Sequence, residues 1–477
     1  MLKRWLSNSS RVRRAFGLAG LVCLVGLSLC SVGLTACKKK PPLVVPDPLL
    51  DDETVATAPT PAPSAAPSAG PVSSRCHDLP QNNAFTIGEV AQAKAPADDD
   101  DAGGPDQDDE VPAPFSVELG LARADASGFL VSALRSTKGQ AHALIAVLPG
   151  DASTGKLVDL GAVHGDPDPA QFALHGADLL VAASDTDAGG GMLKLGLVRD
   201  VRGAATLSWG PEITGVRRDS TFALEVSGER ALLAYAAEVS GKIRVYGMLV
   251  DPANLKNKLT PEPLSAAGAD VDSPRLALRK GGYWLAVARS LDAPKAKSKS
   301  HGNDAGAALA EDDSLLDLGT RRIELTKLDA QGKAVSSALV VTAPGAKPMT
   351  FDLVAAADGG AYVGFREDDS TPGADGGPLE LVHVKPDGTF EKLALDGDTN
   401  GTGTPSLLVD ASDPAKVWLA AAGESGSTWF GRIGDHTALS ADSVVRGADL
   451  VAARDGQLLL ARSKGTAAEL SVVQCAE

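Results

Sequence analysis

The sequence is poor in aromatic residues, and it lacks the motifs of the common enzyme classes. Aromatic residues make up 4% of the 477 residues although hydrophobic residues reach 44%, so a core must consist mainly of Ala, Leu and Val. The seven histidines are scattered, and HExxH, CxxC, GxSxG and phosphate-binding motifs are absent. The sequence therefore favours a binding protein over an enzyme, and it predicts no catalytic residue.

Basic residues are also fewer than acidic residues. Lys and Arg number 45 against 61 Asp and Glu, which gives a formal net charge of −16. A nucleic-acid-binding protein needs a basic surface to meet the phosphates, so nucleic acid is excluded as a partner. The same acidity argues against direct adhesion of the folded body to an anionic membrane.

A hairpin pattern recurs seven times between Phe115 and Glu477, and its clearest copy runs from Arg275 to Ser290. Each copy has an alternating apolar run, a turn rich in Gly or Asp, and a second run with a small residue at a fixed place. Such runs predict antiparallel hairpins. The small residues are Ser132, Ala182, Ala234, Ala286, Gly364, Ala420 and Ala461.

The copies recur roughly every 50 residues, which is the period of a propeller blade rather than of a solenoid. Two further strand candidates follow each hairpin, as at 242–252 and 379–388, so each repeat supplies four strands. We therefore predict an all-β, seven-bladed β-propeller of four-stranded antiparallel blades, most consistent with a monomer. An array of two-sheet sandwiches is the alternative, and it explains the near-constant period less well.

The seventh repeat runs out of chain after its third strand, at 467–477. The segment 83–91 is the one unassigned strand candidate before the first blade, so we expect it to complete blade seven and close the ring. Cys76 would then precede the added strand while Cys475 ends its antiparallel neighbour. This placement predicts a Cys76–Cys475 disulfide that ties the chain ends together.

The first 36 residues have the pattern of a targeting segment. Lys3 and Arg4 open a basic region, an apolar stretch follows at 17–33, and Leu34-Thr35-Ala36-Cys37 ends it. This motif resembles the lipobox of bacterial lipoproteins. The resemblance implies a signal peptide at 1–36 and a Cys37 that carries acyl chains such as palmitate and holds the protein to a membrane. An uncleaved membrane anchor is the alternative.

By the sorting rule that the resemblance brings with it, Lys38 after the lipidated cysteine favours the outer membrane of the cell envelope. Residues 37–75 are rich in Pro, Ala and Ser and predict a disordered tether, followed by the propeller at 76–477. Cys23 and Cys30 would leave with the signal. Two cysteines then remain beyond Cys37, in a compartment where disulfides persist.

The loops divide between the two faces of the predicted ring. Turns between first and second and between third and fourth strands are short, whereas the opposite face receives the long segments 97–110, 184–192, 291–320, 367–377 and 396–405. Long loops on a rigid scaffold commonly carry binding residues. We therefore expect a binding scaffold whose acidic long-loop face, directed away from the membrane, takes a protein, glycan or cation.

Two other functions stay open at this point. A propeller hydrolase or lyase acting on a polysaccharide would place its site at the axial mouth of the same face. The protein could also be an assembly scaffold within an envelope complex. Convergent carboxylates, Arg or His at the axial mouth would favour the enzyme, and a mouth of Ala, Leu and Val would count against it.

One local motif suggests calcium as a ligand. Asp396, Asp398 and Asn400 alternate and are followed by Gly401, as in the first half of a calcium-binding loop. Leu407 stands where that loop has its bidentate Glu, so another residue would have to supply the missing oxygens. The alternative is a turn rich in Asx and Gly residues.

Overall fold

The computed structural model describes residues 76–79, 84–88, 116–137, 140–165, 167–187, 190–217, 221–257, 259–266, 270–291, 320–367, 377–397, 399–401, 403–423, 427–434 and 436–475. Within these ranges all regular structure is β-strand. No helix in this part of the chain has the length and apolar character needed to cross a bilayer.

The first four sheets contain four strands each, as the repeat predicts. Blade 1 contains β3 (Ser116–Asp125), β4 (Gly128–Thr137), β5 (Gln140–Leu148) and β6 (Lys156–Val163). Blade 2 contains β7 (Gln171–His175), β8 (Asp178–Asp187), β9 (Gly190–Arg199) and β10 (Thr206–Val216). Blade 3 contains β11 (Phe222–Ser227), β12 (Arg230–Val239), β13 (Lys242–Val250) and β14 (Glu262–Pro263). Blade 4 contains β15 (Asp270–Arg279), β16 (Gly282–Leu291), β17 (Thr320–Asp329) and β18 (Leu339–Val340).

Blade 6 also has four strands, whereas blades 5 and 7 carry additional strands. Blade 5 contains β19 (Pro348–Ala355), β20 (Ala361–Glu367), β21 (Gly377–Val384) and β22 (Phe390–Asp396), with β23 (Asn400–Gly401) on β21. Blade 6 contains β24 (Ser406–Val409), β25 (Val417–Ala422), β26 (Thr428–Arg432) and β28 (Ser440–Ala441). The strand β27 (His436–Ala438) pairs in parallel with β22 and so joins blade 6 to the outer edge of blade 5.

Blade 7 consists of β29 (Asp449–Arg454), β30 (Gln457–Lys464), β31 (Ala467–Cys475) and two short strands from the other end of the propeller. β1 (Cys76–Asp78) and β2 (Phe85–Ile87) both pair antiparallel with β31. The predicted closure by the segment 83–91 is confirmed. Its described strand covers Phe85–Ile87, and the added edge also begins earlier than predicted, at Cys76 itself.

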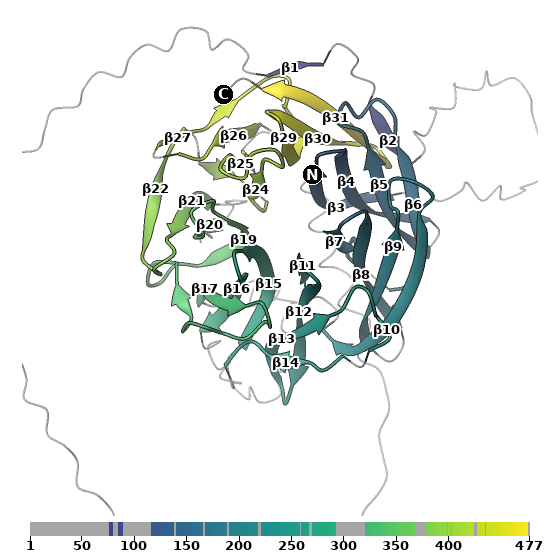
Figure 1. Ribbon diagram of the computed structural model, residues 1–477. Coiled ribbons are helices and arrows are strands. Elements are labelled where there is room, and N and C mark those ends of the chain that lie inside the picture. Colours follow the sequence, from purple (N-terminus) through teal and green to yellow (C-terminus); the bar gives the residue numbers. More distant parts are fainter. Residues whose placement is uncertain are drawn as a thin grey trace, which may run out of the picture. The chain divides into compact units, whose positions relative to one another are not determined.

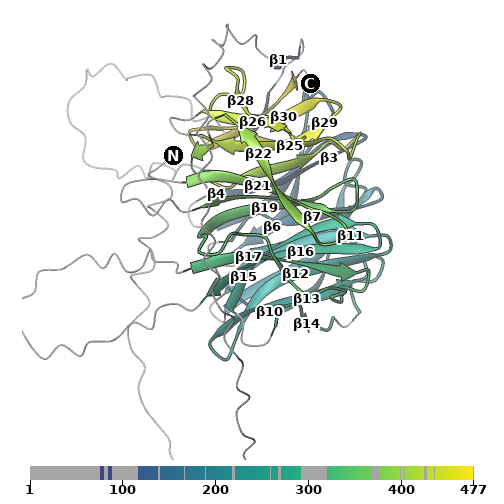
Figure 2. The same ribbon diagram turned by 90° about the vertical axis from the view of Figure 1, so that its left-hand side faces the viewer.

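The seven blades form a closed ring, seen along its axis in Figure 1 and from the side in Figure 2. The hydrophobic core is divided into seven clusters, and each lies between two neighbouring blades. The small residues of the second strands are buried in these clusters, with Ala182, Ala234 and Ala286 at 0% exposure. Small side chains at this position let the faces of adjacent sheets approach, and the predicted seven-bladed, all-β propeller is confirmed.

Candidate functional site at the axis of the ring

The strand register places one residue of each innermost strand directly opposite the small residue of the second strand. We call six of these residues the axial ring. They are Gln171, Ala223, Arg275, Asp352, Ser406 and Asp449, which pair with Ala182, Ala234, Ala286, Gly364, Ala420 and Ala461. Because the innermost strands surround the axis and contact one another in sequence around it, these six positions form one level of the ring.

In blade 1 a bulge interrupts this level between Leu119 and Ala122. Gly120 lies within the bulge, and a β-carbon there would come 2.4 Å from the Cβ of Pro169, in the segment that enters blade 2. A side chain at this position would therefore collide with the neighbouring blade. Glycine here lets blades 1 and 2 close together, and blade 1 contributes no side chain to the axial ring.

The axial ring lies toward the face that carries the long loops. Gln171, Ser406 and Asp449 are the first residues of β7, β24 and β29. The innermost strands begin at the face where the chain enters each blade and end at the tight turns on the opposite face. A ligand approaching over the long-loop face would therefore meet the axial ring before the rest of the inner strands.

Side chains from non-neighbouring blades meet at the axis. Arg123 of β3 forms an ion pair with Glu225 of β11, and Glu225 retains only 8% exposure. This pair joins blade 1 to blade 3, with blade 2 between them in the ring. Ionised groups at the axis are thus close enough to interact across the ring.

Asp352 and Arg275 form a second centre of charge. The carboxylate of Asp352 accepts the backbone N–H groups of Leu353 and Leu407, each at 2.8 Å. Burial raises the pKa of Asp352, although these hydrogen bonds and the charges of Arg275 and Arg123 act in the opposite direction. Each oxygen of Asp352 therefore accepts one backbone N–H, and the bond from Leu407 links blade 5 to blade 6.

Arg275 lies in the electrostatic field of two carboxylates and against an aromatic ring. Burial lowers the pKa of its guanidinium, while the negative charges of Asp352 and Asp168 raise it. The guanidinium carbon lies 5.8 Å from the centre of the Phe351 ring, and Nη1 donates to the carbonyl of Pro274 at 3.2 Å. Asp168 precedes blade 2, so this interaction also crosses from one side of the ring to another.

The other polar members of the axial ring have free hydrogen-bonding groups. Gln171 and Ser406 are partly exposed and Asp449 is exposed. Within the described residues none of these three side chains makes a hydrogen bond or an ion pair. The protein packed around Asp449 desolvates its carboxyl and raises its pKa although the side chain still reaches solvent, and no neighbouring charge counteracts this effect. An amide, a hydroxyl and a carboxyl are therefore available to a ligand at one level of the axis.

The long-loop ends of blades 5 and 6 are fastened by one buried arginine. Arg366, at 3% exposure, donates to the carbonyls of Gly377, Thr399 and Ala422 at 2.9, 2.8 and 2.6 Å. These carbonyls belong to separate segments that lie far apart in the sequence. Arg366 thus holds the rim of the propeller next to the axial ring, which gives the site a rigid surrounding.

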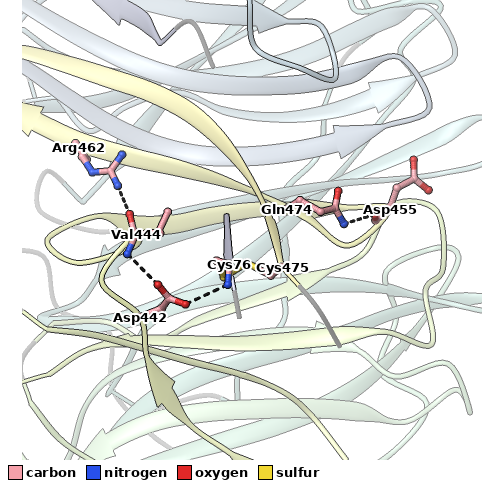
Figure 3. The surroundings of a disulfide bond; sticks show 7 residues. All are labelled: Cys76, Asp442, Val444, Asp455, Arg462, Gln474 and Cys475. Atoms are coloured by element: carbon pink, nitrogen blue, oxygen red, sulfur yellow. Dashed lines mark hydrogen bonds between the residues drawn. A yellow bond between two sulfur atoms is a disulfide. The ribbon is translucent and has the colours of Figure 1, made fainter. Parts of the chain in front are cut away.

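The predicted disulfide is present between Cys76 and Cys475, with an S–S distance of 2.07 Å. Figure 3 shows its surroundings: the backbone N–H of Cys76 donates to Asp442, which also accepts the N–H of Val444. The N–H of Cys475 donates to the carbonyl of Gly456, in the tight turn between β29 and β30. The disulfide therefore lies on the short-turn face, opposite to the entrance of the axial ring.

The other predicted site residues are only partly described. Asp396 is exposed and ends β22, and Asn400 lies in β23, whereas Asp398 and Cys37 fall outside the described residues. The described residues contain no group of three or more His, Cys, Asp and Glu that could hold a metal ion. Calcium binding by the 396–400 segment thus stays a prediction, as does lipidation of Cys37.

No protein-family model matches the chain, and no curated protein is similar to it in sequence. Among solved structures, it resembles an ulvan lyase of polysaccharide lyase family PL25, with 9% identity over 76% of this chain and 95% of that one, at a TM-score of 0.49. It also resembles the β-propeller domain of the Trilobed protease from Pyrococcus furiosus, with 10% identity, coverage of 76% and 94%, and a TM-score of 0.43. The α-L-arabinofuranosidase of Fusarium graminearum, bound to arabinobiose, matches at 14% identity, coverage of 68% and 92%, and a TM-score of 0.41. Similarity at this level says nothing about what this chain binds.

Proposed function

We propose that the protein is a lipid-anchored propeller of the cell envelope that binds a glycan at the axial ring, with the long-loop face as its approach. The observation that carries this proposal is the set of unpartnered hydrogen-bonding groups at the axis, contributed by Gln171, Ser406 and Asp449. Planar amide and carboxyl groups with a hydroxyl match the alternating donors and acceptors of sugar hydroxyl groups. Their position on strands, rather than on loops, holds them in place before the ligand arrives.

The envelope part of the proposal is supported by the sequence and by the cysteines. The stretch Leu34-Thr35-Ala36-Cys37 resembles a lipobox. The Cys76–Cys475 disulfide suits a protein that folds in an oxidising compartment, because cytosolic thiols are kept reduced. On this proposal the lipid on Cys37 anchors the chain, and the tether joins the propeller on the short-turn face.

The binding proposal is tested with purified full-length protein in detergent on an array of neutral and charged polysaccharides. The double variant Gln171→Ala with Ser406→Ala removes two of the three free groups. We expect at least a tenfold loss of affinity, because each lost hydrogen bond to a ligand contributes about 1 kcal/mol. The matched control is Gln331→Ala with Ser443→Ala, two exposed residues away from the axis. The proposal is wrong if no glycan binds, or if both double variants bind as the wild type does.

A second candidate function is glycan cleavage, favoured by the raised pKa of Asp449. A carboxyl that stays protonated to higher pH is suited to act as a general acid. Glycosidases need a second carboxylate, however, and both oxygens of Asp352 already accept backbone N–H groups. Arg275, Asp352 and Asp449 at the axis nevertheless meet the criterion set out above for an enzyme, so cleavage stands beside binding as a candidate function. Release of reducing ends or of unsaturated products from a bound polysaccharide, lost in Asp449→Asn, would decide for the enzyme.

A further inference from the structure

On one side of the axis the charged side chains lie near groups of opposite charge, whereas on the other side Asp449 does not. Arg123 pairs with Glu225, and Arg275 lies in the field of Asp352 and Asp168. These groups belong to blades 1 to 5 and to the segment that enters blade 2. Asp449 of blade 7 has no cation beside it, so the axial ring presents one carboxyl whose charge nothing in the described residues balances.

The elements packed against Asp449 explain why it has no partner. β24 and β25 contribute no charged residue to this side of blade 6. On β3, Arg123 is engaged by Glu225 and Asp125 by Arg202, and the third charged residue, Glu118, is itself an acid.

The basic residues of blade 7 are also engaged elsewhere. Arg462 of β30 donates to the carbonyl of Val444 and to Ser471, and Lys464 pairs with Glu469. Arg454, at the far end of β29, lies against Asp455 on the short-turn face. Arg446, three residues before Asp449, is exposed, but neither it nor any other described cation acts on the pKa of Asp449, so this carboxyl is open to a positive charge supplied by a ligand.

We propose that Asp449 is the ligand-selecting residue of the axial ring, and that it recognises a protonated amine on the glycan, as in an amino sugar. An ammonium group would form a charge-assisted hydrogen bond to the carboxylate and neutralise its charge. Gln171 and Ser406, at the same level, would hold neighbouring hydroxyl groups. A metal ion fits less well, because the described residues offer no group of three acidic, His or Cys ligands here.

The inference rests on the proposed glycan binding, and it is tested with two oligosaccharides of equal length that differ at the amino group. Glucosamine oligomers carry amines that are protonated at mildly acidic pH, whereas N-acetylglucosamine oligomers carry neutral acetamide groups. We expect the full-length protein to bind the glucosamine oligomer at least tenfold more tightly at mildly acidic pH, where the amines are protonated and the Asp449 carboxyl is still ionised. Asp449→Asn should abolish that preference. Glu262→Gln makes the same change of charge on the outer strand β14 and should retain it.

A pH series adds a readout that a merely structural role would not affect. Affinity for the glucosamine oligomer should first rise as its amines take up protons and then fall at lower pH as Asp449 takes up a proton, while affinity for the acetylated oligomer stays constant. If both oligomers bind equally to wild type and to Asp449→Asn, the amine inference is wrong and glycan binding stands. If neither binds, the proposed function falls with it. Normal thermal melting of Asp449→Asn shows that a lost preference is not caused by misfolding.

Discussion

Two carboxylates of blades 6 and 7 have opposite roles in this propeller, and their neighbours decide which. Asp410 is fully buried, and although burial raises its pKa, the Ser412 hydroxyl and the backbone N–H groups of Gly456, Ser412 and Asp455 donate to it and hold its pKa below the usual range. Asp449 has no such donors, and its pKa is raised. The first group fastens the turn of blade 6 to that of blade 7, and the second is left for a ligand.

Replacing Asp449 should therefore stabilise the free protein. Because the pKa of Asp449 is raised in the folded state, its ionised carboxylate lowers the free energy of unfolding at pH values above that pKa. Below the ordinary pKa of about 3.9, where the group is protonated in both states, this loss of stability vanishes. Asp449→Asn should raise the free energy of unfolding at pH 7 by up to about 1 kcal/mol, a small value because the side chain remains exposed. It should have little effect near pH 3. Denaturant unfolding at both pH values measures this, and a destabilised Asp449→Asn at pH 7 would reveal a partner for the carboxylate.

Replacing Arg366 should lower the free energy of unfolding, by more than the Asp449 substitution raises it. Its guanidinium donates to three carbonyl groups, and its side chain is almost completely buried. Arg366→Met keeps the bulk of the side chain and leaves those carbonyls without this donor, so we expect a loss of about 3–5 kcal/mol in the free energy of unfolding. The exposed Arg432→Met serves as the control. Equal unfolding midpoints for the two variants would contradict the role assigned to Arg366.

At the scale of strands, the sequence pattern was sufficient to predict the blades but not the residues of the candidate site. Alternating runs, Gly turns and the small residue of each second strand predict hairpins, because burial between two blades demands those residue types. The axial ring leaves no comparable pattern. Arg275, Asp352 and Asp449 each look like one polar residue in an alternating strand, and they stand out only as the partners of aligned small residues.

The closing strands were predictable for a different reason. A blade that lacks its fourth strand exposes an edge, so the chain must supply a strand from elsewhere. The segment around Ile87 and the two cysteines were the candidates that fitted, and all are found there. The rim of the long-loop face was not predictable, since Arg366 contacts three segments whose separation in sequence gives no hint of their proximity.

Reduction of the disulfide should weaken the ring without opening it. β2 remains paired with β31, and Ile87 stays buried at 0% exposure in the core between blades 7 and 1. The disulfide joins residues 399 apart in sequence, so its loss should cost about 3–5 kcal/mol. Denaturant unfolding with and without reductant tests this. The double variant Cys76→Ser with Cys475→Ser serves as the control and should no longer respond to reductant. An unchanged wild-type transition would show that the disulfide does not stabilise the closure.

On the scale of the whole molecule, the disulfide at Cys76, where the proposed tether would join, and the candidate site lie on opposite faces. Cys76 is bound to Cys475 beside the turn at Gly456, whereas Gln171, Ser406 and Asp449 begin the inner strands at the other face. A tether that ends at Cys76 would approach the propeller from the side away from the axial entrance. A pull on the tether would also pass through the disulfide into β31, the third strand of blade 7, rather than peel the short strand β1 from the edge of the sheet.

This arrangement has value only if Cys37 carries the lipid, which can be tested directly. Cells expressing the protein are grown with an alkynyl palmitate, and label on the purified protein is measured after membrane fractionation. We expect wild type to be labelled and membrane-bound. Cys37→Ser should lose the label, because the thiol that would carry lipid is gone, whereas Cys30→Ser should keep it, since that residue lies within the predicted signal. Label retained by Cys37→Ser would place the acyl chain elsewhere, and a wild-type protein without label would remove the lipid anchor from the proposal while leaving the axial ring untouched.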